Sequence, residues 1–381
     1  MGLYRDVVRP VLFRFDAESV HHAAISLGRH LGWAGGALRA RYEVRDPRLA
    51  TSVCGIDFPN PVGLAAGFDK SGDAVSALAG LGFGFIEIGS VSAKPSAGNP
   101  KPRLFRLAAD RAIVVHYGLP NDGAEAIAQR LARVRLPVPL GINLVKTNLG
   151  PDAPPDTADA IIEDYVRSAR LLAPRGDYLA LNLSCPNTET GRNFFEDKVH
   201  ITRCLDALAG LGITCPVFLK ISPLGGVHAI ETVLEAAEPF GLVSGFIFNL
   251  PPVKPAGLVT PRHVWEATPG AVSGRPVEAM MNAAIAELYR RMDRKRYRII
   301  GVGGVFTAEQ AYEKIRLGAS LVQILTALVY EGPGVVRRIN RGLAELLARD
   351  GFQTVAEAVG TDNAETGAAR TSTRDPIALS V

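Results

Sequence analysis

The sequence predicts a (β/α)8 TIM barrel with a helical extension at its N-terminus. From residue 61 onward, eight short apolar runs alternate with longer stretches in which apolar residues recur at helical spacing. Near-continuous apolar runs are typical of parallel strands covered on both faces. Eight strand-helix units without a sign of a switch point favour a closed barrel over a doubly wound open sheet.

The expected elements follow one another in a regular order. Strands are expected at 61–65, 83–88, 139–143, 178–183, 217–221, 245–249, 298–302 and 321–325. Helices between and after them include 124–134, 157–172, 278–292, 307–317 and 334–348. We therefore assign 46–350 to the barrel and 1–45 to the N-terminal extension. The small, polar composition of 351–381 predicts a mobile tail.

Composition limits the partners and the compartment. The 381 residues carry 42 Lys and Arg against 38 Asp and Glu, a net charge of +4. This balance argues against a nucleic-acid partner, which requires a basic stripe. The four cysteines (Cys54, Cys185, Cys204 and Cys215) form no CxxC pair, so neither a metal site nor a disulfide framework is expected. Because the chain also shows no membrane-spanning apolar run and no signal-peptide order, we expect a cytoplasmic protein.

The first 32 residues predict two amphipathic helices. Residues 3–15 place apolar side chains on one face and arginines largely on the other, and Pro10 is expected to kink or break this helix. Asp16 is a candidate N-cap for a second helix over 17–31, which a glycine-rich stretch ends. The pair either docks on the barrel as a hairpin or lies in the interface of the cytoplasmic membrane as a peripheral contact through residues 1–32. Composition leaves both interpretations open.

Polar residues and glycines follow the expected strands, and the C-terminal strand ends of a barrel form its active site. Gly303 and Gly304 precede a helix, which suits a bound phosphate, although a glycine-rich turn needs the same residues for its backbone alone. Thr326 could add a hydroxyl. Lys220 lies inside an apolar strand, where a phosphate, an electron-rich cofactor ring or a barrel carboxylate would balance its charge.

A second polar group follows the first and fourth strands. Lys70 could bind a substrate carboxylate, although a solvated surface lysine fits the same pattern. Cys185 lies between Asn182 and Asn187, where nearby lysines and amides could lower the thiol pKa and make it a base or nucleophile. The two asparagines can hydrogen-bond a planar polar ring. The alternative is an Asx-turn loop around an inert thiol.

Several motifs together resemble one family. They are NPVGLAAGFDKSGD (60–73), GNPKPRLFRL (98–107), NLSCPNT (182–188), SGRPV (273–277), GVGGV (301–305) and LVYEGPG (328–334). In this order they are similar to dihydroorotate dehydrogenases, and the N-terminal segment resembles the membrane-associated, quinone-dependent class 2 branch. The resemblance covers roughly residues 4–350.

The resemblance implies bound FMN, oxidation of dihydroorotate to orotate in pyrimidine biosynthesis, and a quinone that takes up the electrons. By motif position, the residues implied to contact FMN are Ala66, Gly67, Lys70, Ser90, Asn143, Asn182, Lys220, Asn249, Gly274, Gly303, Gly304, Leu325 and Thr326. Those implied to surround the substrate are Lys70, Val115, His116, Tyr117, Gly118, Leu119, Asn182, Asn187, Leu250 and Pro251. Cys185 occupies the position of the catalytic base.

The sequence departs from the family pattern mainly around the substrate. Class 2 members have serine where this chain has Cys185, and a thiol ionises more readily than a hydroxyl. Val115 replaces a substrate-binding asparagine, and Leu250 replaces a second one unless a one-residue shift gives that role to Asn249. Pro251 replaces a threonine. Each buried polar group left unpaired costs about 1–3 kcal/mol.

Three functions therefore stay open at this point. The first is a quinone-dependent dihydroorotate dehydrogenase. The second is a diverged FMN dehydrogenase or reductase that acts on a different, less polar carboxylate or ring. The third is a flavin-binding protein without catalysis.

Overall fold

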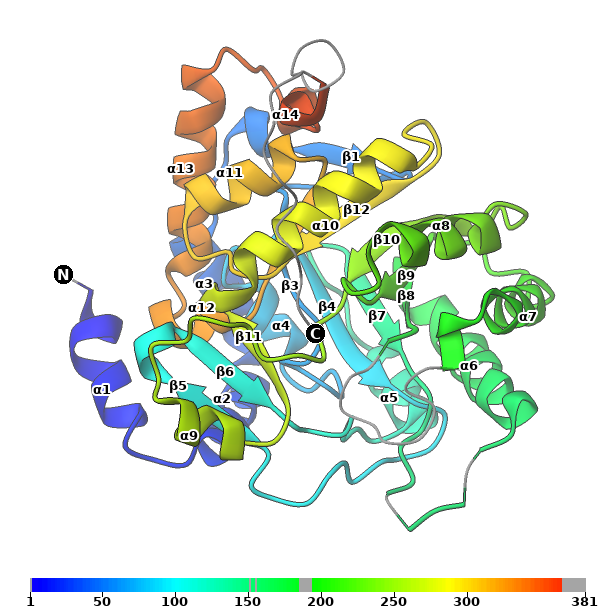
Figure 1. Ribbon diagram of the computed structural model, residues 1–381. Helices are drawn as coiled ribbons and strands as arrows, with labels where there is room; N and C mark the ends of the chain where they lie inside the picture. The colour runs from blue at the N-terminus through cyan, green and yellow to red at the C-terminus, as the bar shows by residue number, and fades with distance from the viewer. Residues whose placement is uncertain (1, 151, 155, 185–193, 365–381) are drawn as a thin grey trace.

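The computed structural model describes residues 2–150, 152–154, 156–184 and 194–364, and its centre is a closed barrel of eight parallel strands (Figure 1). Around the barrel the order is β10 (Val243–Phe248), β12 (Arg298–Val302), β13 (Leu321–Ile324), β3 (Val62–Leu64), β4 (Phe85–Val91), β7 (Leu140–Leu144), β8 (Tyr178–Asn182) and β9 (Val217–Ile221). Each of these strands overlaps one expected apolar run, so the predicted barrel is confirmed.

Helices cover the outside of the barrel (Figure 1). They include α4 (Val75–Ala79), α5 (Ala124–Leu131), α6 (Ala158–Leu172), α7 (Lys198–Ala209), α8 (Gly226–Ala237), α10 (Glu278–Arg291), α11 (Ala308–Arg316) and α13 (Val335–Arg349). The five helices named from sequence agree with α5, α6, α10, α11 and α13 to within three residues at each end. Shorter helices are α9 (Arg262–Ala267), α12 (Thr326–Glu331) and α14 (Thr361–Ala364).

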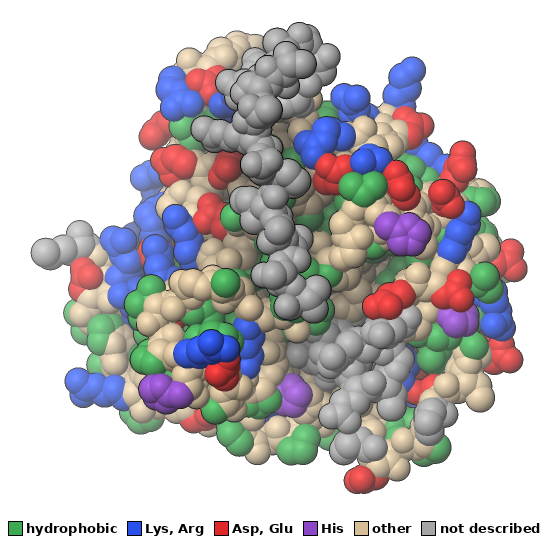
Figure 2. Space-filling view, viewed as in Figure 1, with side chains coloured by type: hydrophobic (Ala, Val, Ile, Leu, Met, Phe, Trp, Pro, Cys, Tyr) green, Lys and Arg blue, Asp and Glu red, His purple; other side chains and the backbone are tan. Residues whose placement is uncertain are grey.

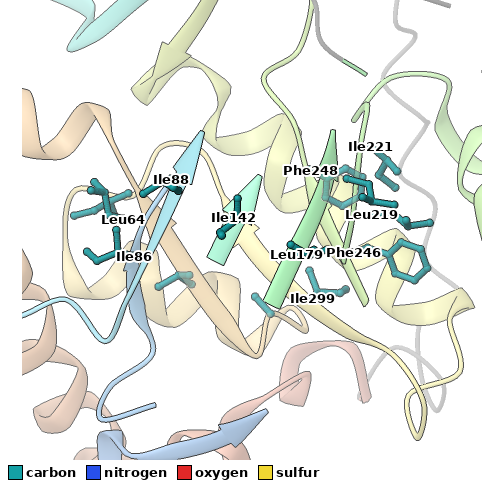
Figure 3. Close-up of a cluster of buried hydrophobic side chains, with 14 of the residues drawn as sticks. Leu64, Ile86, Ile88, Ile142, Leu179, Leu219, Ile221, Phe246, Phe248 and Ile299 are labelled. Atoms are coloured by element: carbon teal, nitrogen blue, oxygen red, sulfur yellow. The ribbon is translucent and has the colours of Figure 1, made fainter. Parts of the chain in front are cut away.

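The strands alternate between two apolar environments. On β4, Ile86 and Ile88 face the helices and belong to the large outer core, part of which is drawn in Figure 3. Phe85 faces the barrel interior and packs with Tyr178 and Phe218. Such period-two alternation lets one strand serve the helix layer and the interior at once. The barrel interior is therefore apolar near the N-terminal ends of the strands, and we call this part the apolar lower layer.

Two small sheets were not expected from the sequence. A hairpin of β1 (Thr51–Val53) and β2 (Ile56–Phe58) packs Val53 and Phe58 against the apolar lower layer of the barrel. A three-stranded antiparallel sheet has the order β11 (Ala271–Gly274), β6 (Ala112–Val115) and β5 (Leu104–Leu107). This second sheet joins segments 160 residues apart and reaches the active-site end of the barrel.

The N-terminal extension docks on the barrel. Asp16 caps α2 (Ala17–His30) as predicted, because its carboxylate accepts a hydrogen bond from the Ser19 backbone N–H at 2.8 Å. Glu18 on α2 is buried and binds Arg103 of the barrel unit at 2.8 Å. The chain then continues into α3 (Gly35–Tyr42), a helix that the glycine-rich sequence did not indicate.

Pro10 does not break the first helix. The segment begins as a π-helix over Tyr4–Val8 and continues directly into α1 (Arg9–Leu12). Pro10 stands in the first turn of α1, where a missing backbone N–H is tolerated. No helix among the described residues is long and apolar enough to cross a membrane.

The prediction of a mobile tail from residue 351 is wrong for residues 351–364. Val355 and Ala358 are fully buried in the outer core, and the Gly360 backbone N–H donates to the Ile315 carbonyl at 3.0 Å. Phe352 and Val359 also pack against this core, so apolar burial holds an otherwise small, polar segment in place. The rest of the predicted tail, 365–381, lies outside the described residues.

Candidate active site

One cavity of about 630 Å³ runs from the C-terminal strand ends to the N-terminal helices. Its lining includes these predicted site residues: Ala66, Gly67, Lys70, Ser90, Val115, Tyr117, Leu119, Asn182, Lys220, Asn249, Leu250, Pro251, Gly274, Gly303, Gly304, Leu325 and Thr326. The fold thus gathers residues from seven barrel strand ends and the small sheet around one space.

Three predicted residues do not line this cavity. Asn143 is fully buried beneath it and hydrogen-bonded to Ser90 and Glu87. The His116 imidazole contacts the Asn99 amide at 3.2 Å, and Gly118 packs closely against Asn99. Two further predicted residues, Cys185 and Asn187, lie outside the described residues.

A buried carboxylate that the sequence reasoning missed lies under the cavity. Glu87 on β4 is fully buried, and its Oε1 lies 3.4 Å from the Lys220 ammonium nitrogen. Its other oxygen accepts hydrogen bonds from the Gln323 amide at 2.7 Å and the Tyr178 hydroxyl at 2.9 Å. The barrel carboxylate considered for Lys220 is therefore present. A glutamate inside the apolar run 83–88 was the signal that could have found it.

A row of amides continues from Glu87 toward the cavity. The Asn143 amide donates to Glu87 at 3.2 Å, and the Ser90 hydroxyl donates to the Asn143 carbonyl oxygen. The Asn182 amide donates to Ser90 at 3.1 Å, and its own oxygen accepts from the Asn249 amide at 2.9 Å. All four polar residues of this row are buried. These side-chain hydrogen bonds connect β4, β7, β8 and the end of β10 beneath the cavity.

Asn249, the residue next to Leu250, is hydrogen-bonded within the protein at both ends of its amide. Its amide N–H groups donate to Asn182 and to the Ser184 carbonyl, both at 2.9 Å. Its oxygen accepts from the Leu250 backbone N–H at 2.9 Å. Both amide N–H groups of Asn249 are therefore used within the protein, and Leu250 and Pro251 line the cavity beside it.

Lys70 follows β3 and lines the cavity. Its Nζ lies 3.7 Å from the ring centroid of Tyr117, and no carboxylate in the described part of the chain comes within ion-pair distance of it. Burial, with a smaller contribution from the Arg103 charge, lowers the pKa of Lys70 to about 7. A carboxylate ligand would supply the missing counter-charge.

His21 of α2 stands between the Lys70 region and the N-terminal part of the cavity. Its ring meets Phe68 edge-on at 5.2 Å between centroids and lies 6.2 Å from Tyr117. Burial, with the nearby Lys70 charge, lowers the pKa of His21 to about 2, so the imidazole is neutral. The sequence reasoning did not single out this residue.

The opposite wall of the cavity is a glycine cradle. Gly304 has φ +76°, and a Cβ there would lie 2.8 Å from the Cα of Glu278, so glycine is needed for both conformation and space. The Thr326 hydroxyl lies 3.0 Å from the Ser273 hydroxyl, a cavity residue that sequence reasoning also missed. The SGRPV motif contains Ser273 and could have indicated it.

The residues of the cavity fit a flavin. The Gln323 side-chain oxygen is buried and has no hydrogen-bond partner among the described residues. The Lys220 ammonium has three protons and only one acceptor within reach there. A flavin ring above the cavity floor offers acceptors and donors to such groups, and a phosphate suits the glycine cradle.

The far end of the cavity is apolar and comes from the N-terminal segment. Its lining there consists of Leu12, Phe13, Ala17, Val20, Ala24, Leu27, Gly28, Leu31, Leu38 and Tyr42. The barrel contributes further apolar lining residues, among them Leu104 and Leu328. A long apolar molecule can therefore reach the cavity floor between α2, α3 and the barrel.

Comparisons with known proteins agree over most of the chain. A family model for dihydroorotate dehydrogenase matches residues 48–347. The dihydroorotate dehydrogenase (quinone) of Natronomonas pharaonis is 42% identical over 368 residues, covering 95% of this chain and 100% of that protein. The corresponding Mycolicibacterium smegmatis protein is 41% identical over 362 residues, covering 94% of this chain and 99% of that one.

Solved structures give the same answer. The crystal structure of the Eimeria tenella dihydroorotate dehydrogenase with ferulenol superposes with a TM-score of 0.77 at 31% identity, covering 91% of this chain and 96% of that chain. The ligand-free structure from the same organism gives a TM-score of 0.76 at 32% identity, with coverages of 88% and 98%. The chain therefore belongs to the dihydroorotate dehydrogenase family, a family of flavin-dependent oxidoreductases.

Proposed function

We propose that this chain oxidises dihydroorotate to orotate with FMN as its flavin and a quinone as electron acceptor. The observation that carries this proposal is the single cavity that joins the Lys70 side, the floor with Lys220 and Asn182, and the apolar end between α2 and α3. One space can therefore hold a carboxylate substrate, a flavin and an apolar acceptor in contact.

The flavin would supply an acceptor for a hydride from the substrate and a donor of electrons to the quinone. Lys220, Asn182 and Gln323 would hold the ring from the cavity floor. The backbone of Gly303 and Gly304, with the Thr326 hydroxyl, would hold a single phosphate, which favours FMN.

The proposal also assigns residues of the chain to substrate binding and proton removal. Lys70 would bind the carboxylate, and the ring of Tyr117 keeps its ammonium in place. The neutral His21 and the Phe68 ring line the cavity beside Lys70 and add no charge there. Cys185 stays a prediction as the base, since it lies outside the described residues.

The direct test uses the purified protein with its bound flavin. Dihydroorotate added without oxygen should bleach the flavin absorption, and a soluble quinone analogue should restore it. Heat-released flavin, identified by chromatography and mass spectrometry, should be FMN. Absence of bleaching at millimolar dihydroorotate, in protein that carries its flavin and is bleached by dithionite, would remove dihydroorotate as the substrate.

The apolar edge of the cavity adds a specificity test to the same assay. Val115, Leu119, Leu250 and Pro251 line the cavity, and Asn249 is hydrogen-bonded within the protein. A panel of saturated and cyclic carboxylic acids should bleach the flavin less than dihydroorotate does. Bleaching by another member of the panel and not by dihydroorotate would contradict the proposed substrate.

Peripheral membrane contact through the N-terminal segment is part of the proposal. Leu3, Val7, Val11, Phe15 and Leu27 are each at least half exposed in spite of their apolar character. Figure 2 shows green apolar and blue basic side chains next to each other on the left edge, where the N-terminal segment lies. Such a surface suits the interface of a membrane that holds the quinone.

A further inference from the structure

The polar layer under the cavity is organised by one side chain. Glu87 is fully buried, and four donors converge on its two oxygens: Lys220, Asn143, Tyr178 and Gln323. An ionised carboxylate accepts hydrogen bonds and donates none. Every group that touches Glu87 must therefore present a proton to it.

This requirement fixes the direction of the amides above Glu87. Because Asn143 turns its N–H toward Glu87, its oxygen faces Ser90 and accepts from that hydroxyl. Ser90 then has its oxygen lone pairs available and accepts from the Asn182 amide at 3.1 Å. The charge at Glu87 thus decides which end of each amide faces the next residue.

The same carboxylate balances the buried Lys220 ammonium. Lys220 lines the cavity and is only 6% exposed, and Glu87 is the one carboxylate that the described residues place within 4 Å of it. Removing one partner of a buried ion pair leaves an uncompensated charge, whereas removing both partners is often tolerated. The electrostatic potential at a flavin ring beside Lys220 therefore depends on Glu87, although Glu87 does not line the cavity.

We propose that Glu87 is a positioning residue for the flavin: it holds Lys220 and, through Asn143 and Ser90, orients Asn182 beneath the ring. This inference rests on the proposed flavin site. Glu87 would then help to set the reduction potential of the flavin from below the cavity.

The test compares two variants of the flavin-loaded protein. One changes Glu87 itself, and the other changes a residue that is hydrogen-bonded to Glu87. Glu87→Gln keeps the size of the side chain and removes the charge, which leaves the Lys220 charge uncompensated and favours the reduced, more negative flavin. The midpoint potential should rise by at least about 30 mV, a tenfold change in the two-electron equilibrium. Tyr178→Phe, the matched control, removes an uncharged hydrogen-bond donor from Glu87 without changing the charge of either residue, and should change that equilibrium less than about threefold.

A variant of Lys220, the other partner of the ion pair, should change the midpoint potential in the opposite direction. Lys220→Met leaves the Glu87 charge uncompensated, so the midpoint potential should fall. The visible spectrum of the bound flavin should shift in both charge variants and stay unchanged in Tyr178→Phe. A Glu87→Gln protein with the potential and spectrum of the parent overturns the inference.

A double variant keeps the inference testable if Glu87→Gln fails to fold. If Glu87→Gln does not fold, Glu87→Gln combined with Lys220→Met should recover folding, because neither buried charge remains. A folded Glu87→Gln protein that holds no flavin, with flavin retained in Tyr178→Phe, supports the inference. A double variant that also fails to fold, while Tyr178→Phe folds, overturns the inference. A parent protein that holds no flavin would instead contradict the proposed function on which it rests.

Discussion

The Lys70 ammonium nitrogen lies 3.7 Å from the ring centroid of Tyr117 and has no carboxylate partner in the described part of the chain. An aromatic face attracts a cation but does not replace a counter-ion. Burial accordingly lowers the pKa of Lys70 to about 7. In the proposed function this Lys70 would bind the substrate carboxylate, and its lowered pKa would make that binding depend on pH.

The first prediction concerns that pH dependence. Below pH 7 Lys70 is charged, and above pH 7 it loses its proton in the free protein. The dissociation constants of orotate and of benzoate, followed by flavin absorption, should therefore rise by up to about tenfold for each pH unit above 7. Lys70→Arg keeps its charge at every pH used and should bind with a flat profile. Parallel profiles for the parent and Lys70→Arg would exclude Lys70 as the titrating group.

The second prediction concerns the apolar edge of the substrate side. Val115→Asn combined with Leu250→Asn restores two polar side chains beside the cavity, and each new hydrogen bond to a pyrimidine dione should contribute about 1 kcal/mol. Orotate should then bind at least tenfold more tightly, measured by flavin titration. The matched control, Val115→Ile with Leu250→Met, changes volume without polarity and should not improve binding. Equal orotate affinity in all three flavin-loaded proteins contradicts the role of these two positions.

The third prediction concerns the glycine cradle. Gly304→Ala should lose bound flavin and stability, because φ is +76° and the new Cβ would lie 2.8 Å from the Cα of Glu278. Gly212→Ala is the control, since φ there is +65° and nothing lies within 4 Å of an added Cβ. The free energy of unfolding of the control should fall only by the cost of the new backbone strain, about 1–2 kcal/mol, and the control should keep its flavin. Flavin content and thermal unfolding measure both effects, and full flavin retention in Gly304→Ala would count against the cradle.

The fourth prediction concerns the N-terminal surface. Replacing Leu3, Val7 and Phe15 together by serine should reduce flotation with phospholipid vesicles by more than tenfold, because these exposed apolar side chains would enter the membrane interface. Val199→Ser removes an equally exposed valine from α7, away from the N-terminal segment, and should float like the parent. Unchanged flotation of the triple variant, or none for the parent, contradicts membrane contact through this segment.

Local sequence patterns determined most of the barrel. The eight apolar runs correspond to β3, β4, β7, β8, β9, β10, β12 and β13, since a buried parallel strand needs only a short apolar stretch between turns. The Asp16 cap was readable for the same reason, because its partner Ser19 is three residues away. The family motifs also lie in short continuous segments, and the comparisons confirm the family that they indicated.

The tertiary structure decided which of these segments meet. Lys220 and Glu87 are 133 residues apart, and only closure of the barrel brings them together. The internal use of Asn249 and the docking of Val355 likewise depend on neighbours from other elements. The sequence by itself therefore determined the barrel, the family and the residues at the strand ends. The partners of those residues were decided by the fold, because hydrogen bonds and ion pairs between distant strands leave no periodic trace in either strand.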